Sequence, residues 1–285
     1  MTLFSKNTSR RSLQALGLVI TLLSLQGVAA AHHVVSEAGI AWVEPLDVIQ
    51  LEVESARFEL DDNFGQGRWW STSLMMEYAI WQRFSLMARA PLVSVAFDDG
   101  RRATGLGDMD VSLKGLLWAD KHGLFIVSSG VGVELPTGSV SAALGSGHVE
   151  ISPYLTLSSN PKPWLVLNSL VQHRSSLTPE TSATVESSHQ GSPLAVHAPH
   201  ELLTRLNLTL LRSSQRVYVT SGFDYIHVWK DVEPALGDAL LLRGEVGYFS
   251  QPRRWRVALR AETPAFLTTT RARTSLSTNL AIFWP

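Results

Sequence analysis

The chain has 285 residues, with 24 Lys and Arg against 25 Asp and Glu, and it contains no cysteine. The near-neutral charge and the lack of a basic stripe exclude a nucleic-acid-binding protein. The missing thiols exclude disulfides, a lipoprotein anchor and cysteine-based metal or catalytic sites.

The N-terminus predicts a cleaved signal peptide. Three basic residues precede an apolar run, 13–25, which has the length of a signal-peptide core but is short for a membrane helix. Small residues then fit cleavage after Ala30 or after Ala31. We therefore predict a signal peptide at 1–30, a periplasmic segment at 31–46 and a barrel at 47–285.

Beyond residue 46, apolar and polar residues alternate in one segment after another. Leu206, Leu208 and Leu210, for example, alternate with Asn207 and Thr209. This period of two is typical of strands whose faces meet different surroundings. We predict twelve such strands, each long enough for the roughly 9–11 residues of a membrane-crossing strand. They lie near 47–59, 68–80, 83–97, 107–118, 123–135, 147–158, 163–173, 200–212, 216–229, 238–249, 254–263 and 274–284.

The connections between these strands alternate in length. Short ones are expected at 81–82, 119–122, 160–162, 213–215 and 251–253, and long ones at 60–67, 98–106, 136–146, 174–199, 230–237 and 264–273. Outer-membrane barrels combine tight periplasmic turns, longer outer loops and an even strand number. The fold class predicted is therefore all-β, a single transmembrane antiparallel up-and-down barrel in a Gram-negative outer membrane.

Tryptophans gather at the predicted strand ends. Five lie at the short-turn ends (Trp81, Trp118, Trp164, Trp255 and Trp284) and three near the outer ends (Trp69, Trp70 and Trp229). Two aromatic girdles are expected of a membrane barrel. The last strand alternates outward up to Trp284 but ends in Pro285, so we predict that recognition by the barrel assembly machinery depends on Trp284.

Charged residues of both signs fall at the inward positions. The candidates to line a pore are Glu77, Arg89, Lys114, Glu134, Glu150, Arg205, Arg243, Glu245, Arg260 and Glu262. Two interpretations stay open at this stage. The charges pair and simply fill a hydrated barrel, or they form a constriction that selects small polar or amphipathic solutes by charge and width.

Histidines supply a weaker signal for metal. His32 and His33 lie near the predicted mature terminus, where a free amine and an imidazole together could bind Cu(II) or Ni(II). The histidine-containing loop 174–199 is rich in Ser, Thr and Pro, which favours a solvated surface loop. Neither a nucleophile elbow nor a phosphate-binding loop is present, and Asp224 with His227 forms no dense acid–histidine cluster. We expect no enzyme and no cofactor.

Three short motifs resemble a known family. They are 104–114 (TGLGDMDVSLK), 135–138 (LPTG) and 144–147 (LGSG), with 90–95 (APLVSV) before them. As a set, over about 83–158, they resemble the outer-membrane transporters grouped as the phenol-degradation meta-pathway (MetA-pathway) family. The resemblance implies a barrel that transports aromatic or other hydrophobic compounds, with no catalytic residues.

The glycines of these motifs permit two tight outer loops (Gly100, Gly105 and Gly107; Gly138, Gly145 and Gly147). Two neighbouring loops of this kind could fold inward as a lid, and ordinary turn chemistry explains the glycines equally well.

The function predicted is passive passage of a small, hydrophobic or amphipathic solute across the outer membrane. The alternatives are a closed structural or solute-binding barrel without conductance, and a copper-linked protein using His32 and His33. The expected partners are outer-membrane lipid and lipopolysaccharide, the barrel assembly machinery and a small-molecule solute.

Overall fold

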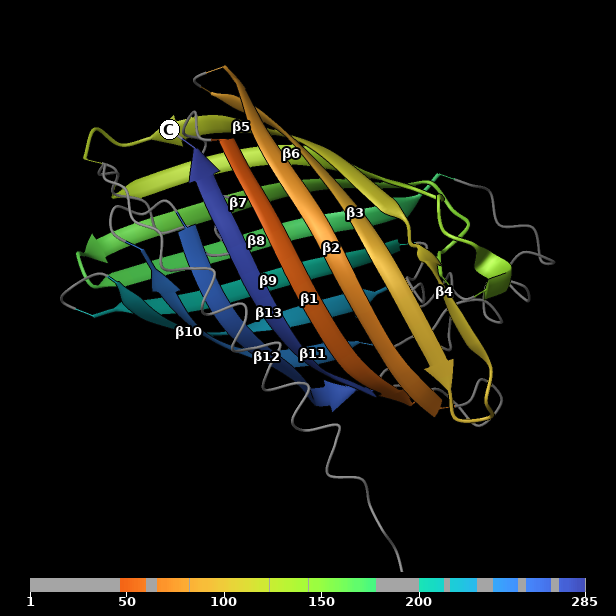
Figure 1. The fold of residues 1–285 in the computed structure, drawn as a ribbon. Helices are drawn as coiled ribbons and strands as arrows, with labels where there is room; N and C mark the ends of the chain where they lie inside the picture. The colour runs from red at the N-terminus through yellow and green to blue at the C-terminus, as the bar shows by residue number, and fades with distance from the viewer. Residues whose placement is uncertain are drawn as a thin grey trace, which may run out of the picture.

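The computed structural model of the chain is a closed antiparallel β-barrel (Figure 1). It describes residues 47–59, 66–81, 83–122, 124–142, 144–177, 200–212, 216–229, 238–250, 255–267 and 272–284. The predicted signal peptide and the predicted segment 31–46 lie outside these residues. Within the described ranges, no helix is long and apolar enough to cross a membrane.

The strands follow one another around the barrel in chain order, apart from β4, which pairs with the outer part of β3. They are β1 (Asp47–Glu59), β2 (Gln66–Trp81), β3 (Phe84–Phe97), β4 (Arg102–Leu106), β5 (Met109–Ala119), β6 (Phe125–Leu135), β7 (Glu150–Lys162), β8 (Leu165–Ser176), β9 (His200–Leu211), β10 (Val217–Val228), β11 (Ala239–Phe249), β12 (Trp255–Leu267) and β13 (Ala272–Trp284), with one 3₁₀ turn, η1 (Val140–Ala142). β1 closes the ring, because Val53 lies opposite both Thr72 of β2 and Thr278 of β13. The predicted up-and-down barrel is confirmed.

Twelve wall strands are built from thirteen strand segments, because β4 and β5 together cross the wall once. Leu92 of β3 lies opposite Leu106 of β4, and Arg89 of β3 lies opposite Asp110 of β5. Between these two pairs, residues 90–91 of β3 lie opposite residues 107–109 of its partner. The extra residue defines a β-bulge at 107–108.

This bulge remains attached to β3, since the backbone N–H of Gly107 donates to the carbonyl of Pro91 at 2.9 Å. The prediction of a loop over 98–106 is wrong in its second half, which is strand β4. Glycines in this stretch interrupt the alternation of apolar and polar residues, so the sequence pattern did not indicate this short strand.

Two predicted connections, 160–162 and 264–273, are wrong in part, because each contains a proline that the structure places in a strand. β7 runs through Pro161 to Lys162, beyond Ser159, where its pairing with β6 ends. A proline is tolerated there because one edge of the strand has no ladder to interrupt. β12 runs through Pro264, which lies at a register shift between Leu240 and Leu241 of β11, and a bulge likewise accommodates proline.

The second correction shortens the last connection to 268–271, which is shorter than three of the turns at the other end of the barrel. The connection between β3 and β4, at 98–101, is equally short. The expected alternation of short and long connections therefore fails at these two hairpins. Figure 1 shows the short turns and the end of β13 at one end and η1 at the other.

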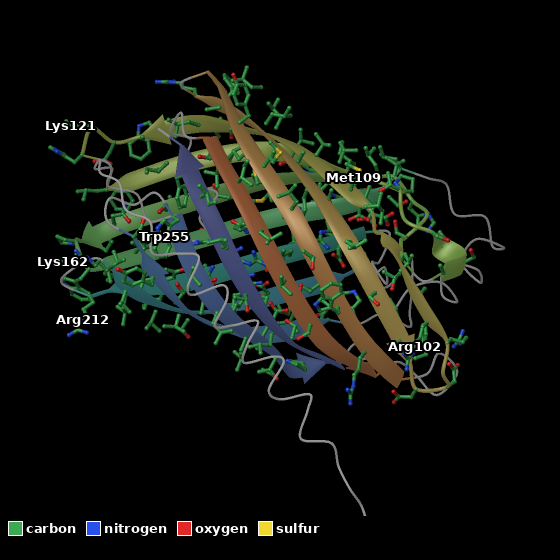
Figure 2. All side chains as sticks on the ribbon, in the orientation of Figure 1. Arg102, Met109, Lys121, Lys162, Arg212 and Trp255 are labelled. Atoms are coloured by element: carbon green, nitrogen blue, oxygen red, sulfur yellow. The ribbon has the colours of Figure 1, made fainter. Side chains whose placement is uncertain are left out.

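The barrel is apolar outside and polar inside. On β9, Leu206, Leu208 and Leu210 are 43%, 40% and 44% exposed, whereas Asn207 and Thr209 between them are 5% and 0% exposed. The side chains on both faces of the wall are drawn in Figure 2. This polarity is the reverse of a water-soluble domain's, and an apolar band of this kind matches the hydrocarbon of a bilayer.

Four of the tryptophans fit the predicted girdles, and one does not. Trp70, Trp118, Trp164 and Trp229 are exposed on the outside. Trp69 is buried and faces the interior, because successive strand residues point to opposite faces and Trp70 points out. The assignment of Trp69 to the outer girdle is wrong.

Candidate functional site: the barrel interior and a docked loop

All ten charged residues predicted to line a pore lie at buried or half-buried positions that alternate with the apolar exterior (Glu77, Arg89, Lys114, Glu134, Glu150, Arg205, Arg243, Glu245, Arg260 and Glu262). Their placement on the inner face follows from the period of two in each strand. The structure joins most of them into ion pairs, described in turn below.

The most extensive pairing joins β9 to β12. Arg205 donates to both carboxylate oxygens of Asp224, at 2.8 and 2.6 Å. Arg243 bridges Asp224 and Glu262, with 2.9 Å to each. Buried charges of opposite sign stabilise one another only when geometry and hydrogen bonding are good, and bidentate Arg–carboxylate pairs meet both conditions. Four neighbouring strands are thus tied together inside the barrel.

A second group lies beside the first. Arg260 contacts Glu245 at 3.0 Å and Glu52 at 3.5 Å, which links β12 to β11 and β1. The hydroxyl of Tyr218 donates to the other oxygen of Glu245 at 2.5 Å. Buried Arg256 donates to Asn279 at 2.9 Å. This side of the interior is filled by its own side chains.

Two members of these groups were missed as lining residues. Asp224 was considered only as a partner of His227 in catalysis, and Tyr218 was not considered. Both occupy the even positions of β10 that face inward, so the alternation could have found them.

The pair Lys114–Glu77 crosses a strand. Glu77 belongs to β2 and Lys114 to β5, and β3 lies between these strands. Their charged atoms are 2.6 Å apart over buried Ser85, and the Lys114 side chain is 2% exposed. A lysine this deeply buried depends on its partner, so the pair acts as an internal strut.

The remaining predicted charges lie toward the long-loop end, where Glu150 is buried and Arg89 is more open. Arg89 and Asp110 are 3.8 Å apart, and both side chains are 41% exposed. Asp110 faces Glu134 across β5 and β6, and Glu134 faces Glu150 across β6 and β7. This carboxylate row is close to Arg174, whose charge interacts with all three and which pairs with Glu201 at 3.0 Å.

Above this row, the outer connection between β6 and β7 docks onto the β4–β5 bulge. We call its described residues, 136–142 and 144–149, the docked loop. Asp108 accepts hydrogen bonds from the backbone N–H of Gly138, at 2.8 Å, and of Ser146. Thr137 donates to the carbonyl of Gly107 at 2.8 Å and accepts from the N–H of Met109 at 3.0 Å. Side chains thus hold the loop where no strand ladder does.

The glycines of the motifs allow this docking. A β-carbon on Gly138 would lie 2.8 Å from the Cα of Gly145, and one on Gly107 would lie 2.9 Å from Val93. Gly147 also has a φ of 78°, a left-handed conformation that suits glycine. The two glycine-rich stretches therefore build one contact, which turn chemistry alone does not explain.

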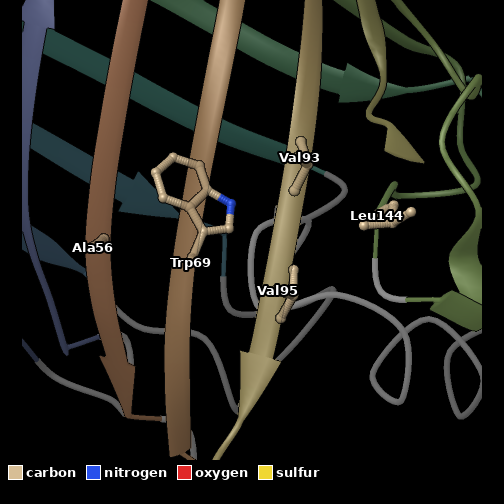
Figure 3. Close-up of a cluster of buried hydrophobic side chains, with 5 residues drawn as sticks. All are labelled: Ala56, Trp69, Val93, Val95 and Leu144. Atoms are coloured by element: carbon tan, nitrogen blue, oxygen red, sulfur yellow. The ribbon is translucent and has the colours of Figure 1, made fainter. Parts of the chain in front are cut away.

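The docked loop places Leu144 inside the barrel. Leu144 packs in a buried cluster with Ala56 of β1, Trp69 of β2, and Val93 and Val95 of β3 (Figure 3). We call these four wall residues the apolar seat. Two other apolar clusters are found among the described residues, and all their members belong to wall strands (Val166, Leu211, Tyr218, Phe249 and Ala258; Val48, Ala281 and Phe283). Leu144 is the one member that a loop supplies.

The predicted metal site lies outside the described residues, because His32 and His33 belong to the masked N-terminal part. In the part of the chain that is described, no group of three or more His, Asp or Glu could hold a metal ion. The catalytic pair weighed above does not form, since Asp224 faces the interior whereas His227 contacts Asp238 at 3.0 Å and makes an edge-to-face contact with Trp229.

Comparison with known proteins identifies the fold. No protein-family model matches the sequence, and no curated protein matches it. Among solved structures, the chain is similar to an outer membrane channel from Pseudomonas putida F1, with a TM-score of 0.65, 9% identity, and coverage of 91% of this chain and 100% of that one. It has the fold of that channel. The KdgM porin is also similar, with a TM-score of 0.53, 10% identity, and coverage of 84% and 99%.

Proposed function

We propose that the protein is a channel of the Gram-negative outer membrane that passes a small, hydrophobic or amphipathic solute without chemical conversion. The observation that carries the proposal is the polarity of the closed barrel, apolar outside and lined with paired charges inside. A membrane barrel of this kind provides a polar route through the bilayer. The names of the two similar structures, an outer membrane channel and a porin, support it.

We infer the class of solute from the surface that the apolar seat offers. Its tryptophan and valines offer an uncharged surface next to the open charges Arg89 and Asp110. A solute with an apolar body and a polar end would find partners for both parts. We therefore place the passage along β1 to β5, lined by Arg89, with the buried pair Lys114–Glu77 inside its wall. The packed pairs of β9 to β12 form the opposite wall.

Membership of the MetA-pathway family is part of the same proposal. The three motifs that carry the resemblance meet at the docked loop, through Asp108, Thr137 and Leu144. Motifs that assemble into one contact are better support than motifs scattered over the chain. Outer-membrane lipid, lipopolysaccharide and the assembly machinery remain the expected partners.

Single-channel conductance of the refolded mature chain in a planar bilayer tests the proposal, with heat-modifiable gel migration as the control for folding. We expect discrete openings whose ion selectivity changes in Arg89→Ala, because this exposed charge borders the proposed passage. Ser221→Ala, at an exposed exterior position, is the matched control and leaves the selectivity unchanged. A folded barrel that carries no current would contradict the channel.

One alternative has an observation in its favour. Arg256, Lys114 and Tyr218 are almost fully buried, and their large side chains fill part of the interior. A closed structural or solute-binding barrel would show this filling together with a lack of current. The copper-linked alternative depends on His32 and His33, and loss of copper binding in His33→Ala would support it.

A further inference from the structure

We propose that the apolar seat is the first binding site for the solute, an uncharged ring or chain, and that the solute enters by displacing Leu144. This inference rests on the proposed channel and specifies its outer entrance. Asp108 is the latch that holds Leu144 in place between passages.

The first argument is the origin of Leu144. The seat is formed by inward-facing residues of β1, β2 and β3, yet a loop side chain, 6% exposed, completes it. A wall residue cannot leave its position without breaking strand pairs. A loop residue can leave together with its loop, so the seat can change occupant while the barrel stays intact.

The second argument is the chemistry of the surroundings. Near the seat the lining is polar: buried Ser71 and Ser73 lie on β2, and Arg89 donates to Ser73 at 3.2 Å. An apolar solute therefore gains little from the neighbouring wall and most from the seat, where apolar surface leaves water. The leucine that occupies the seat has the chemistry that we assign to the solute.

The third argument is how the loop is held. Its contacts with the bulge are few and polar, two to the Asp108 carboxylate and two through Thr137. Among the described strands, none pairs with β4 on the side of the docked loop, since β5 and not β4 pairs with β6. Bonds to water can replace hydrogen bonds of this kind when the loop leaves, so these four bonds hold the loop without fixing it permanently.

A reversible disulfide tests the proposal directly, because the natural chain has no cysteine. A β-carbon built on Gly145 would lie 2.9 Å from the Asp108 carboxyl carbon, the position that a cysteine sulfur would take. It would also lie 2.8 Å from the Cα of Gly138, a contact that a small shift of the loop has to relieve. A disulfide requires about 3 Å between one sulfur and the partner's β-carbon. Asp108→Cys with Gly145→Cys should therefore lock the loop when oxidised and release it when reduced with dithiothreitol.

The readout is ion current through single channels, with toluene added on the long-loop side as the apolar probe. In the reduced double variant we expect toluene to interrupt the current, and in the oxidised form we expect these interruptions to disappear. The two single-cysteine variants, treated alike, are the controls and should respond equally in both conditions.

A second variant removes the occupant without a crosslink. Leu144→Ala should bind toluene about tenfold more tightly, because no leucine has to leave the seat. Leu117→Ala, an exposed leucine on the exterior of β5, is the matched control and leaves the interruptions unchanged. Interruptions that are the same in the locked, released and Leu144→Ala forms would overturn the inference while leaving the channel standing. Folded protein without current in any form would overturn the channel itself.

Discussion

The two sides of the interior are stabilised in different ways. Between β9 and β12, Arg205, Asp224, Arg243 and Glu262 interlock through side chains that all belong to wall strands. Between β1 and β4, the interior is closed by apolar side chains and by Leu144 from a loop. The first side cannot rearrange without leaving charges unpaired, whereas the second changes when a loop moves. The rigid side and the proposed gate therefore lie in different parts of one barrel.

Removing Asp224 should give the largest effect. Asp224→Ala leaves Arg205 and Arg243 without this acceptor, and breaking a buried pair typically costs about 3–5 kcal/mol. We expect this loss in the free energy of unfolding, measured by denaturant titration in lipid vesicles. Asp110→Ala is the control on the open side, where an exposed pair contributes about 1 kcal/mol or less. Equal losses in the two variants would show that the two sides do not differ.

The strut Lys114–Glu77 should show strong coupling. Glu77→Leu leaves a buried ammonium unpaired and should cost about 3 kcal/mol. Adding Lys114→Met should recover most of that loss, because replacing both charges with apolar groups is nearly neutral. A double-mutant cycle on the unfolding free energies measures the coupling. Simple additivity would mean that the two residues act independently.

Removing the carboxylate of Asp108 should affect the docked loop and leave the barrel wall unchanged. Asp108→Ala removes the acceptor of two loop N–H groups, which we expect to accelerate hydrogen exchange at Gly138 and Ser146 by about tenfold or more. The global unfolding free energy should change little, because the barrel pairs remain. Asp99→Ala, whose carboxylate pairs with Arg101 in another loop, is the control. Unchanged exchange rates at Gly138 and Ser146 would show that Asp108 does not hold the docked loop in place.

The smallest effect concerns a turn at the opposite end. Backbone N–H groups donate hydrogen bonds to Asp120, and the N–H of Phe125 has the largest effect. These bonds hold the pKa of Asp120 below its ordinary value. A lowered pKa means that the ionised form stabilises the turn at neutral pH, and that this contribution is lost as the pH falls through the folded-state pKa. The protection factor of the Phe125 N–H, which corrects for slower intrinsic exchange at low pH, should then fall, as NMR would measure. Asp120→Asn should show no such pH dependence.

The sequence alone determined the strands and their faces, because a residue's side of a β-strand depends only on its parity. The ten charged positions fell on the inner face for that reason, and so did Asp224 and Tyr218, which the same rule could have identified. The errors came from local signals: prolines in β7 and β12 and glycines around β4 were taken for loops, although a free edge or a bulge accommodates them.

Pairing and docking were decided by the tertiary structure. Which arginine meets which carboxylate depends on the stagger between strands, and Lys114 reaches Glu77 across an intervening strand, which sequence distance does not reveal. Trp69 and Leu144 meet only because a bulge at 107–108 turns the outer part of the wall and gives the loop a place to dock. Alternation assigns a residue to a face, but only the closed barrel determines its neighbours on that face.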